Sequence, residues 1–281
     1  MSIRSHLPRL LMVMALMGAL HDAPAGADTQ SASARHVVAT FSFRGSDAST
    51  KDLRLTIRVD GVERYDEPVV ASLCASMCSP DIYGAGRPVV HVVNLGPGNH
   101  RDVVLDLFSG GAHCCTIELV FAYDERTGTY RKFERDFGDP SAQLIDLAPG
   151  GRYLFVSADD TFAYRFTDFA ASGLPIEIME FAHHRFIDVT RRFPELVARD
   201  ARTWRRAFAA QSSQHYSDSV GVVAAWAADE DLLGHEELVA HFLAIQSAAG
   251  HLNNGLGNLE PSGHAFVVAL DRFLTMRGYA R

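Results

Sequence analysis

The segment that decides the fold is DVVLDLFSGGAHCCTIELVF, residues 102–121. Two apolar runs with the character of β-strands flank a turn that carries a glycine pair, a histidine and two adjacent cysteines. Short apolar runs bounded by glycine-containing turns predict strands. We therefore expect strands on both sides of a turn that holds His113, Cys114 and Cys115.

A second copy of this pattern follows. IDLAPGGRYLFVSADD (145–160) repeats the arrangement of VNLGPGNHRDVVLDLF (93–108), with Asp146 standing 52 residues after Asn94. PIEIMEF and HRFIDVT then take the places of TIELVFAY and TYRKF, with His183-His184 in a solvated hairpin turn. Such self-similarity is typical of propeller blades. A closed propeller usually needs four or more blades, so we expect propeller-like sheets that do not form a full ring.

The chain before this repeat also has the pattern of strands. HVVATFSF (36–43) alternates in part, and LRLTIRV (53–59) alternates cleanly. Asp60-Gly61 between two such runs is a strong signal for a hairpin, because both turn positions need a positive φ. The small polar residues 28–34 indicate a flexible leader.

The period of the apolar residues changes to that of helices after about residue 190. We expect one helix from Pro194, a second over 218–228, a third over 235–249 and a fourth from Pro261 to a stop at Gly278. Each is expected to be amphipathic, with Leu238, Phe242 and Ile245 forming the buried stripe of the third. The predicted fold class is α+β with several domains: an antiparallel β domain over 28–190 with two blade-like repeats, and a helical domain over 191–281.

The N-terminus and the net charge indicate the compartment and the kinds of partner. Arg4 and Arg9 precede an apolar run, and small residues follow it, which predicts a secretory signal peptide over residues 1–27. The net charge of −8 argues against nucleic-acid and anionic-membrane partners. We therefore expect a secreted, periplasmic or extracellular protein.

Export to an oxidising compartment favours disulfides among the four cysteines, Cys74, Cys78, Cys114 and Cys115, which allow three pairings. Two alternatives remain for the His113-Cys114-Cys115 turn. Imidazole and thiolates can bind copper or zinc, and a pair of thiols can be redox-active.

The residues also resemble a known family. The stretch DVVLDLFSGGAHCC is similar to the strand and turn after a DxDGDGxxE loop in secreted bacterial FG-GAP or VCBS-type proteins. FVSADDTFAYRFTDFAASGLPIEI and SVGVVAAWAADEDLLG resemble later segments of such proteins. The resemblance spans about residues 50–281 and implies a fold more than an activity. It also implies the pairing Cys114–Cys115 with Cys74–Cys78.

In that family the loops usually hold calcium through oxygen ligands. The first loop of this chain has Asn94, Gly96, Gly98 and Asp102 at those positions, and the second has Asp146, Ala148, Gly150 and Leu154. Because each loop keeps at most two side-chain donors and calcium needs about six to eight oxygens, we expect turns without a metal. Asp159 and Asp160 are candidate binding carboxylates, with a solvated turn as the alternative.

No catalytic motif is complete. The histidines of HEELVAH (235–241) are six residues apart, whereas a zinc-protease helix needs them four apart. The sequence therefore predicts a secreted binding or structural module without cofactor or enzymatic activity, whose ligand is a protein or a glycan. The alternative is an extracytoplasmic metal-binding or thiol-redox protein that uses His113, Cys114 and Cys115.

Overall fold

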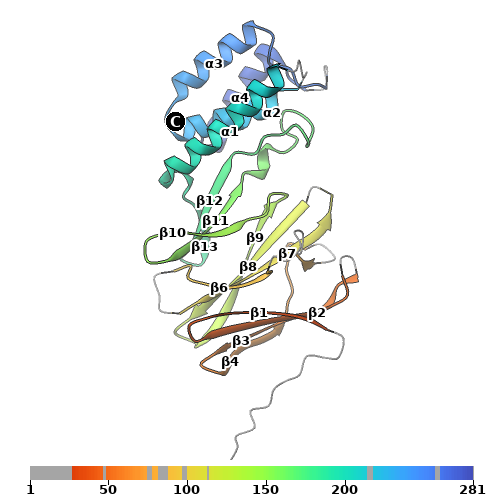
Figure 1. Cartoon of the computed structure of the whole chain (residues 1–281), viewed down its shortest axis with the longest axis vertical. Coiled ribbons are helices and arrows are strands. Elements are labelled where there is room, and N and C mark those ends of the chain that lie inside the picture. Colours follow the sequence, from red (N-terminus) through yellow and green to blue (C-terminus); the bar gives the residue numbers. More distant parts are fainter. Residues whose placement is uncertain are drawn as a thin grey trace, which may run out of the picture.

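The computed structural model describes residues 27–46, 49–74, 78–81, 88–96, 100–112, 114–213, 218–256 and 260–280. Apart from Ala27, the predicted signal peptide lies outside the described residues. Within them, three antiparallel sheets follow one another along the long axis, and four α-helices lie beyond the third sheet (Figure 1). The predicted α+β class is confirmed, and the sheets lie in a row and not in a closed ring.

The first sheet contains β1 (Asp28–Ala34), β2 (Val37–Arg44), β3 (Lys51–Val59) and β4 (Val62–Pro68) in chain order. Asp60 and Gly61 have φ values of 53° and 78°, which confirms the predicted hairpin. The expectation of a flexible leader is wrong, because residues 28–34 form an edge strand paired with β2. Its polar residues have little strand preference of their own, so the strand forms because its backbone pairs with that of β2. The Gln30 side chain also accepts a hydrogen bond from the Val89 amide at 3.0 Å.

The middle sheet contains β5 (Ser79–Pro80), β6 (Val90–Val93), β7 (Asp102–Gly111), β8 (Cys114–Asp124) and β9 (Thr129–Gly138). Alternate residues of β7 and β8 enter two different cores. Those that pack toward the first sheet are Val103, Leu105, Leu107, Ile117, Leu119 and Phe121. Those that pack toward the third sheet are Val104, Val120 and Ala122. Burial on both faces explains why these strands are apolar almost without a break.

The third sheet contains β10 (Gln143–Ala148), β11 (Arg152–Ala158), β12 (Ile176–Ala182) and β13 (Arg185–Asp188). It is an antiparallel meander in chain order, as β6 to β9 are. The two meanders touch at the turns that match in sequence. The Tyr153 amide donates to the Asn94 carbonyl at 2.8 Å, and the Asn94 side chain donates to the Gly150 carbonyl at 3.3 Å.

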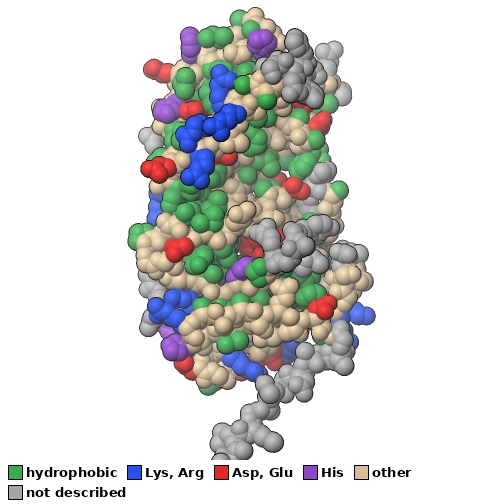
Figure 2. All heavy atoms as spheres, in the orientation of Figure 1, with side chains coloured by type: hydrophobic (Ala, Val, Ile, Leu, Met, Phe, Trp, Pro, Cys, Tyr) green, Lys and Arg blue, Asp and Glu red, His purple; other side chains and the backbone are tan. Residues whose placement is uncertain are grey.

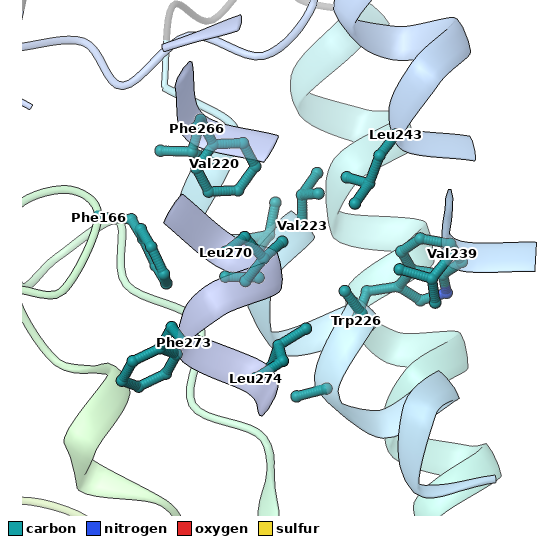
Figure 3. Close-up of a cluster of buried hydrophobic side chains, with 14 of the residues drawn as sticks. Phe166, Val220, Val223, Trp226, Val239, Leu243, Phe266, Leu270, Phe273 and Leu274 are labelled. Carbon is teal, nitrogen blue, oxygen red and sulfur yellow. The ribbon is translucent and has the colours of Figure 1, made fainter. Parts of the chain in front are cut away.

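The helices are α1 (Pro194–Ser213), α2 (Val220–Leu232), α3 (Glu236–Ala248) and α4 (Gly263–Arg277), and α4 ends at Gly278, whose φ is 79°. The expectation that α2 is amphipathic is wrong, because every residue from Val220 to Asp229 is buried. This helix lies at the centre of the helical cluster, and Figure 3 shows Phe166, Trp226, Leu243 and Phe273 converging from four segments. None of the described helices is long and apolar enough to cross a membrane.

The predicted buried stripe of α3 is also wrong in part. Phe242 is buried, but its stripe continues through Val239 and Leu243, whereas Leu238 and Ile245 are 51% and 49% exposed. Both stripes have helical spacing and share Phe242, so packing against α2 and α4 decides which of them is buried.

Candidate functional site

The cysteines lie on the middle sheet and the segment that leads into it. Cys74 and Cys78 form a disulfide with Cα atoms 5.7 Å apart. Cys115 is also disulfide-bonded, and its amide donates to the Ser109 hydroxyl at 3.0 Å. His113 and the Cys114 side chain lie outside the described residues, so the predicted Cys114–Cys115 bridge stays a prediction. Because a sulfur in a disulfide is not a thiolate, the metal and thiol alternatives would require that bond to be reduced.

Asp159 does not lie in a solvated turn. Its side chain is buried, with 5% of the residue exposed, and it accepts hydrogen bonds from the Thr161 amide and hydroxyl and from the Tyr279 hydroxyl at 2.8 Å. The Arg277 guanidinium lies 3.4 Å away. Burial, followed by the charge of Asp159, raises the pKa of Tyr279. Asp159 therefore links the segment at the end of α4 to the loop after β11 through hydrogen bonds and an ion pair.

Asp160 has a similar structural role on the other side of this loop. Its carboxylate accepts from the Asp139 amide at 3.3 Å. A Cβ atom on Gly138 would lie 2.2 Å from the Asp160 carboxyl carbon, so only glycine fits there. Both carboxylates of the pair therefore make structural contacts within the chain.

A pocket lies at the seam between the middle and third sheets, and we call it the inter-sheet pocket. It has a volume of about 570 Å³, which is in the usual range for small-molecule sites. Its lining comes from the loop before β7, the end of β8, the start of β11 and the turn from β12 to β13.

Matching positions of the two repeats line this pocket. His100 and Arg152 stand 52 residues apart, as Asn94 and Asp146 do. In the next aligned strands, Ala122 matches Phe181, and both line the pocket. The alignment of the repeats was visible in the sequence, but it carried no signal that the ends of the matching strands meet.

One wall of the pocket is aromatic. The His100 ring stacks on Tyr123 with centroids 4.2 Å apart, and its Nε2 lies 3.5 Å from a Glu125 carboxylate oxygen. Beneath them, burial raises the pKa of Asp102 to about 6, although the Leu95 amide donates to this carboxylate at 3.2 Å. This wall presents flat ring surface together with an oxygen acceptor.

A second wall of the pocket is charged but internally paired. Arg152 donates to one oxygen of Glu180 at 2.7 Å, and Arg192 donates to the other at 2.6 Å. Burial alone would raise the pKa of Glu180, but these two hydrogen bonds outweigh it and hold the pKa below its ordinary value. Glu180 therefore stays ionised, and this wall offers hydrogen-bond donors and acceptors without a large excess of charge.

The turn between β12 and β13 closes one side of the pocket. His183 and His184 are exposed, as predicted for a solvated turn, and have φ values of 53° and 61°. Asparagine and glycine are the usual residues at both positions of such a hairpin, so two histidines there are uncommon. The His184 ring stacks on Phe133 at 5.1 Å. Across the described part of the chain, no group of three or more histidine, cysteine or acidic residues could hold a metal ion.

No family model matches this chain, and no solved structure matches it. A curated protein of Synechocystis sp., described as a probable thylakoid lumen protein, is 27% identical over 152 residues. The match covers 47% of this chain and 40% of that protein, so the chain spans less than half of its relative's length.

Proposed function

We propose that this protein is an extracytoplasmic binding module that holds a neutral sugar unit of a glycan in the inter-sheet pocket. The observation that carries the proposal is the pairing of an aromatic wall, Tyr123 with His100, and a neutralised polar wall, Arg152 with Glu180. A sugar ring has one apolar face and a rim of hydroxyl groups. The first wall suits the face, and the second offers hydrogen-bond partners to the rim.

Charge argues for a neutral ligand over an acidic one. The positive charges of Arg152 and Arg192 are both directed at Glu180, while Asp102 and Glu125 add carboxylates to the same pocket. An anionic ligand would meet uncompensated negative charge at close range, which costs binding free energy.

Three observations support a location outside the cytoplasm. The N-terminus has the pattern of a signal peptide. The described cysteines are all in disulfides, which persist in oxidising compartments. The distant relative is described by name as a probable lumen protein.

We also infer that the two meanders are repeat units related to propeller blades, in line with the resemblance to FG-GAP and VCBS-type proteins. Their strands have the same order, and their matching turns contact each other through Asn94 and Gly150. This origin would explain why matching positions of the two units line one pocket.

The proposal is tested by titration calorimetry with neutral oligosaccharides: cellohexaose, maltohexaose and chitohexaose. We expect at least one to bind, and Tyr123→Ala to weaken that binding at least tenfold, which is about 1.4 kcal/mol. Tyr164→Ala is the matched control, because Tyr164 is an exposed tyrosine that does not line the pocket. Melting curves of both variants would show that they fold.

The proposal would be abandoned if none of the three sugars bound at about 1 mM, the weak end of the affinity scale, or if both tyrosine variants weakened binding equally. Release of new reducing ends during incubation would show that the protein is an enzyme and not a binding module.

A further inference from the structure

A second concave surface lies between α3 and α4, on the side of the molecule that carries the helices. We call it the helix groove. Its volume is about 580 Å³, and its floor is formed by Val239 and Leu243 of α3 and by Leu270 and Leu274 of α4. The four floor residues are buried members of the helical core, and Figure 3 labels each of them among the side chains of that cluster.

The walls of the helix groove are formed by short apolar side chains. On α3, Ala240, Ala244 and Ala248 recur at every fourth position, which places them in one row along the helix. On α4, Val268 is 57% exposed although it is apolar. A row of alanines lets another backbone approach closely, and residues 240–248 span about 12 Å, or roughly two helical turns. The groove therefore has the size and shape for a helix.

One end of the helix groove carries an excess of negative charge. Asp231, Glu236 and Asp271 meet there from α2, α3 and α4. Asp231 is only 3% exposed, and its Oδ1 atom has no hydrogen-bond donor within the described residues. Burial, followed by the charges of Glu236 and Asp271, raises the pKa of Asp231 to about 7. Arg191 offsets this only in part, because it donates its hydrogen bonds to backbone carbonyls.

We propose that the helix groove binds an amphipathic helix of a partner protein, with apolar side chains on the groove floor and a lysine or arginine at the acidic end. Such a cation would relieve the repulsion among the three carboxylates that meet at this end. A fatty acid would instead bring a further carboxylate to that end. This surface shares no lining residue with the inter-sheet pocket, so the proposal does not depend on the sugar site.

The probes are fluorescein-labelled peptides of about four helical turns, made of leucine, alanine and lysine, with leucines at helical spacing i, i+3, i+7. One peptide carries its lysines at the N-terminal end and another at the C-terminal end, and in a third glutamates replace the lysines. Fluorescence anisotropy with the full protein measures affinity. We expect one lysine peptide to bind and the glutamate peptide to bind at least tenfold more weakly.

Two matched variants locate the site. Val268→Asp places a charge in the groove and should weaken binding of the lysine peptide at least tenfold. Ile245→Asp changes a 49% exposed position of α3 outside the groove lining, so it should leave the affinity unchanged within twofold. Glu236→Gln with Asp271→Asn should weaken the lysine peptide without lowering the melting temperature.

Three results would each overturn the proposal. The first is that neither lysine peptide binds. The second is that Val268→Asp and Ile245→Asp weaken peptide binding equally. The third is that sedimentation shows the free protein to be a dimer which Val268→Asp dissociates, in which case the groove holds a second copy of this chain.

Discussion

Asp229→Asn is expected to stabilise the protein at pH 7 by up to about 4 kcal/mol. Asp229 is fully buried on α2 and faces Asp200 of α1. The Asp200 carboxylate already accepts from the Ile176 amide at 3.0 Å and from the Trp204 indole at 2.9 Å. With both carboxyl groups ionised, neither Asp229 oxygen has a donor within the described residues.

A proton on Asp229 resolves this conflict, because its hydroxyl can then donate to Asp200. Burial, the charge of Asp200 and this hydrogen bond together raise the pKa of Asp229 to about 10 from an unfolded value of 3.8. A carboxyl group whose pKa is raised on folding contributes its full stability below the unfolded pKa. That stability is lost as the pH rises toward the folded pKa. Each pH unit above about 4 therefore costs about 1.4 kcal/mol.

Asparagine keeps the shape of the protonated acid and donates to Asp200 at every pH. Urea denaturation of the wild type and the variant at pH 5, 6, 7 and 8 should show a difference that grows by up to about 1.4 kcal/mol per pH unit. Acids with raised pKa values that are not coupled to Asp229, such as Glu177, titrate in both proteins and cancel in this difference, whereas Asp200 titrates together with Asp229. Glu237→Gln, which changes an exposed carboxylate of α3, should leave the pH dependence as it is in the wild type. A difference that stays constant with pH would show that Asp229 is ionised in the folded protein.

Arg191→Ala is expected to destabilise the helices by about 3 kcal/mol. Arg191 lies just after the third sheet, and its guanidinium donates to four backbone carbonyls. Two of them, Asp231 and Leu232, end α2, and two, Gly278 and Tyr279, follow α4. Hydrogen bonds from a charged donor contribute about 1.5 to 3 kcal/mol each before solvent exposure lowers them. Carbonyls at helix ends have no other partner inside the helix.

Both tryptophans, Trp204 and Trp226, lie in helices, so their fluorescence reports on the helical part during urea unfolding. The midpoint should fall for Arg191→Ala and recover only in part for Arg191→Lys, because lysine cannot bridge both helix ends at once. Arg192→Ala is the matched control. Arg192 is half-exposed and pairs with Glu180, which keeps Arg152, so its loss should cost less than about 1 kcal/mol. Equal effects of the two alanine variants would contradict the role we assign to Arg191.

Local patterns in the sequence were enough to predict much of the secondary structure. The Asp60-Gly61 turn, the strands around residues 102–121 and the stop at Gly278 depend on backbone preferences of single residues and on the period of neighbouring apolar side chains. These properties act over a few residues, so they can be read from the chain in order. The wrong assignment at residues 28–34 has the same origin, since an edge strand is stabilised by its neighbour and not by its own residues.

The candidate sites required the tertiary structure. Asp159 and Asp160 look like a solvated acidic turn until Tyr279 and Gly138, distant in sequence, are placed beside them. The sequence by itself determined the α+β class, the repeated meander and most helix and strand positions, because those follow from local periodicity. Only the tertiary structure decided that α2 is central, that the ends of two repeats form one pocket and that α3 and α4 leave a groove. Each of these depends on which faces meet, and contacts between distant segments leave no local pattern.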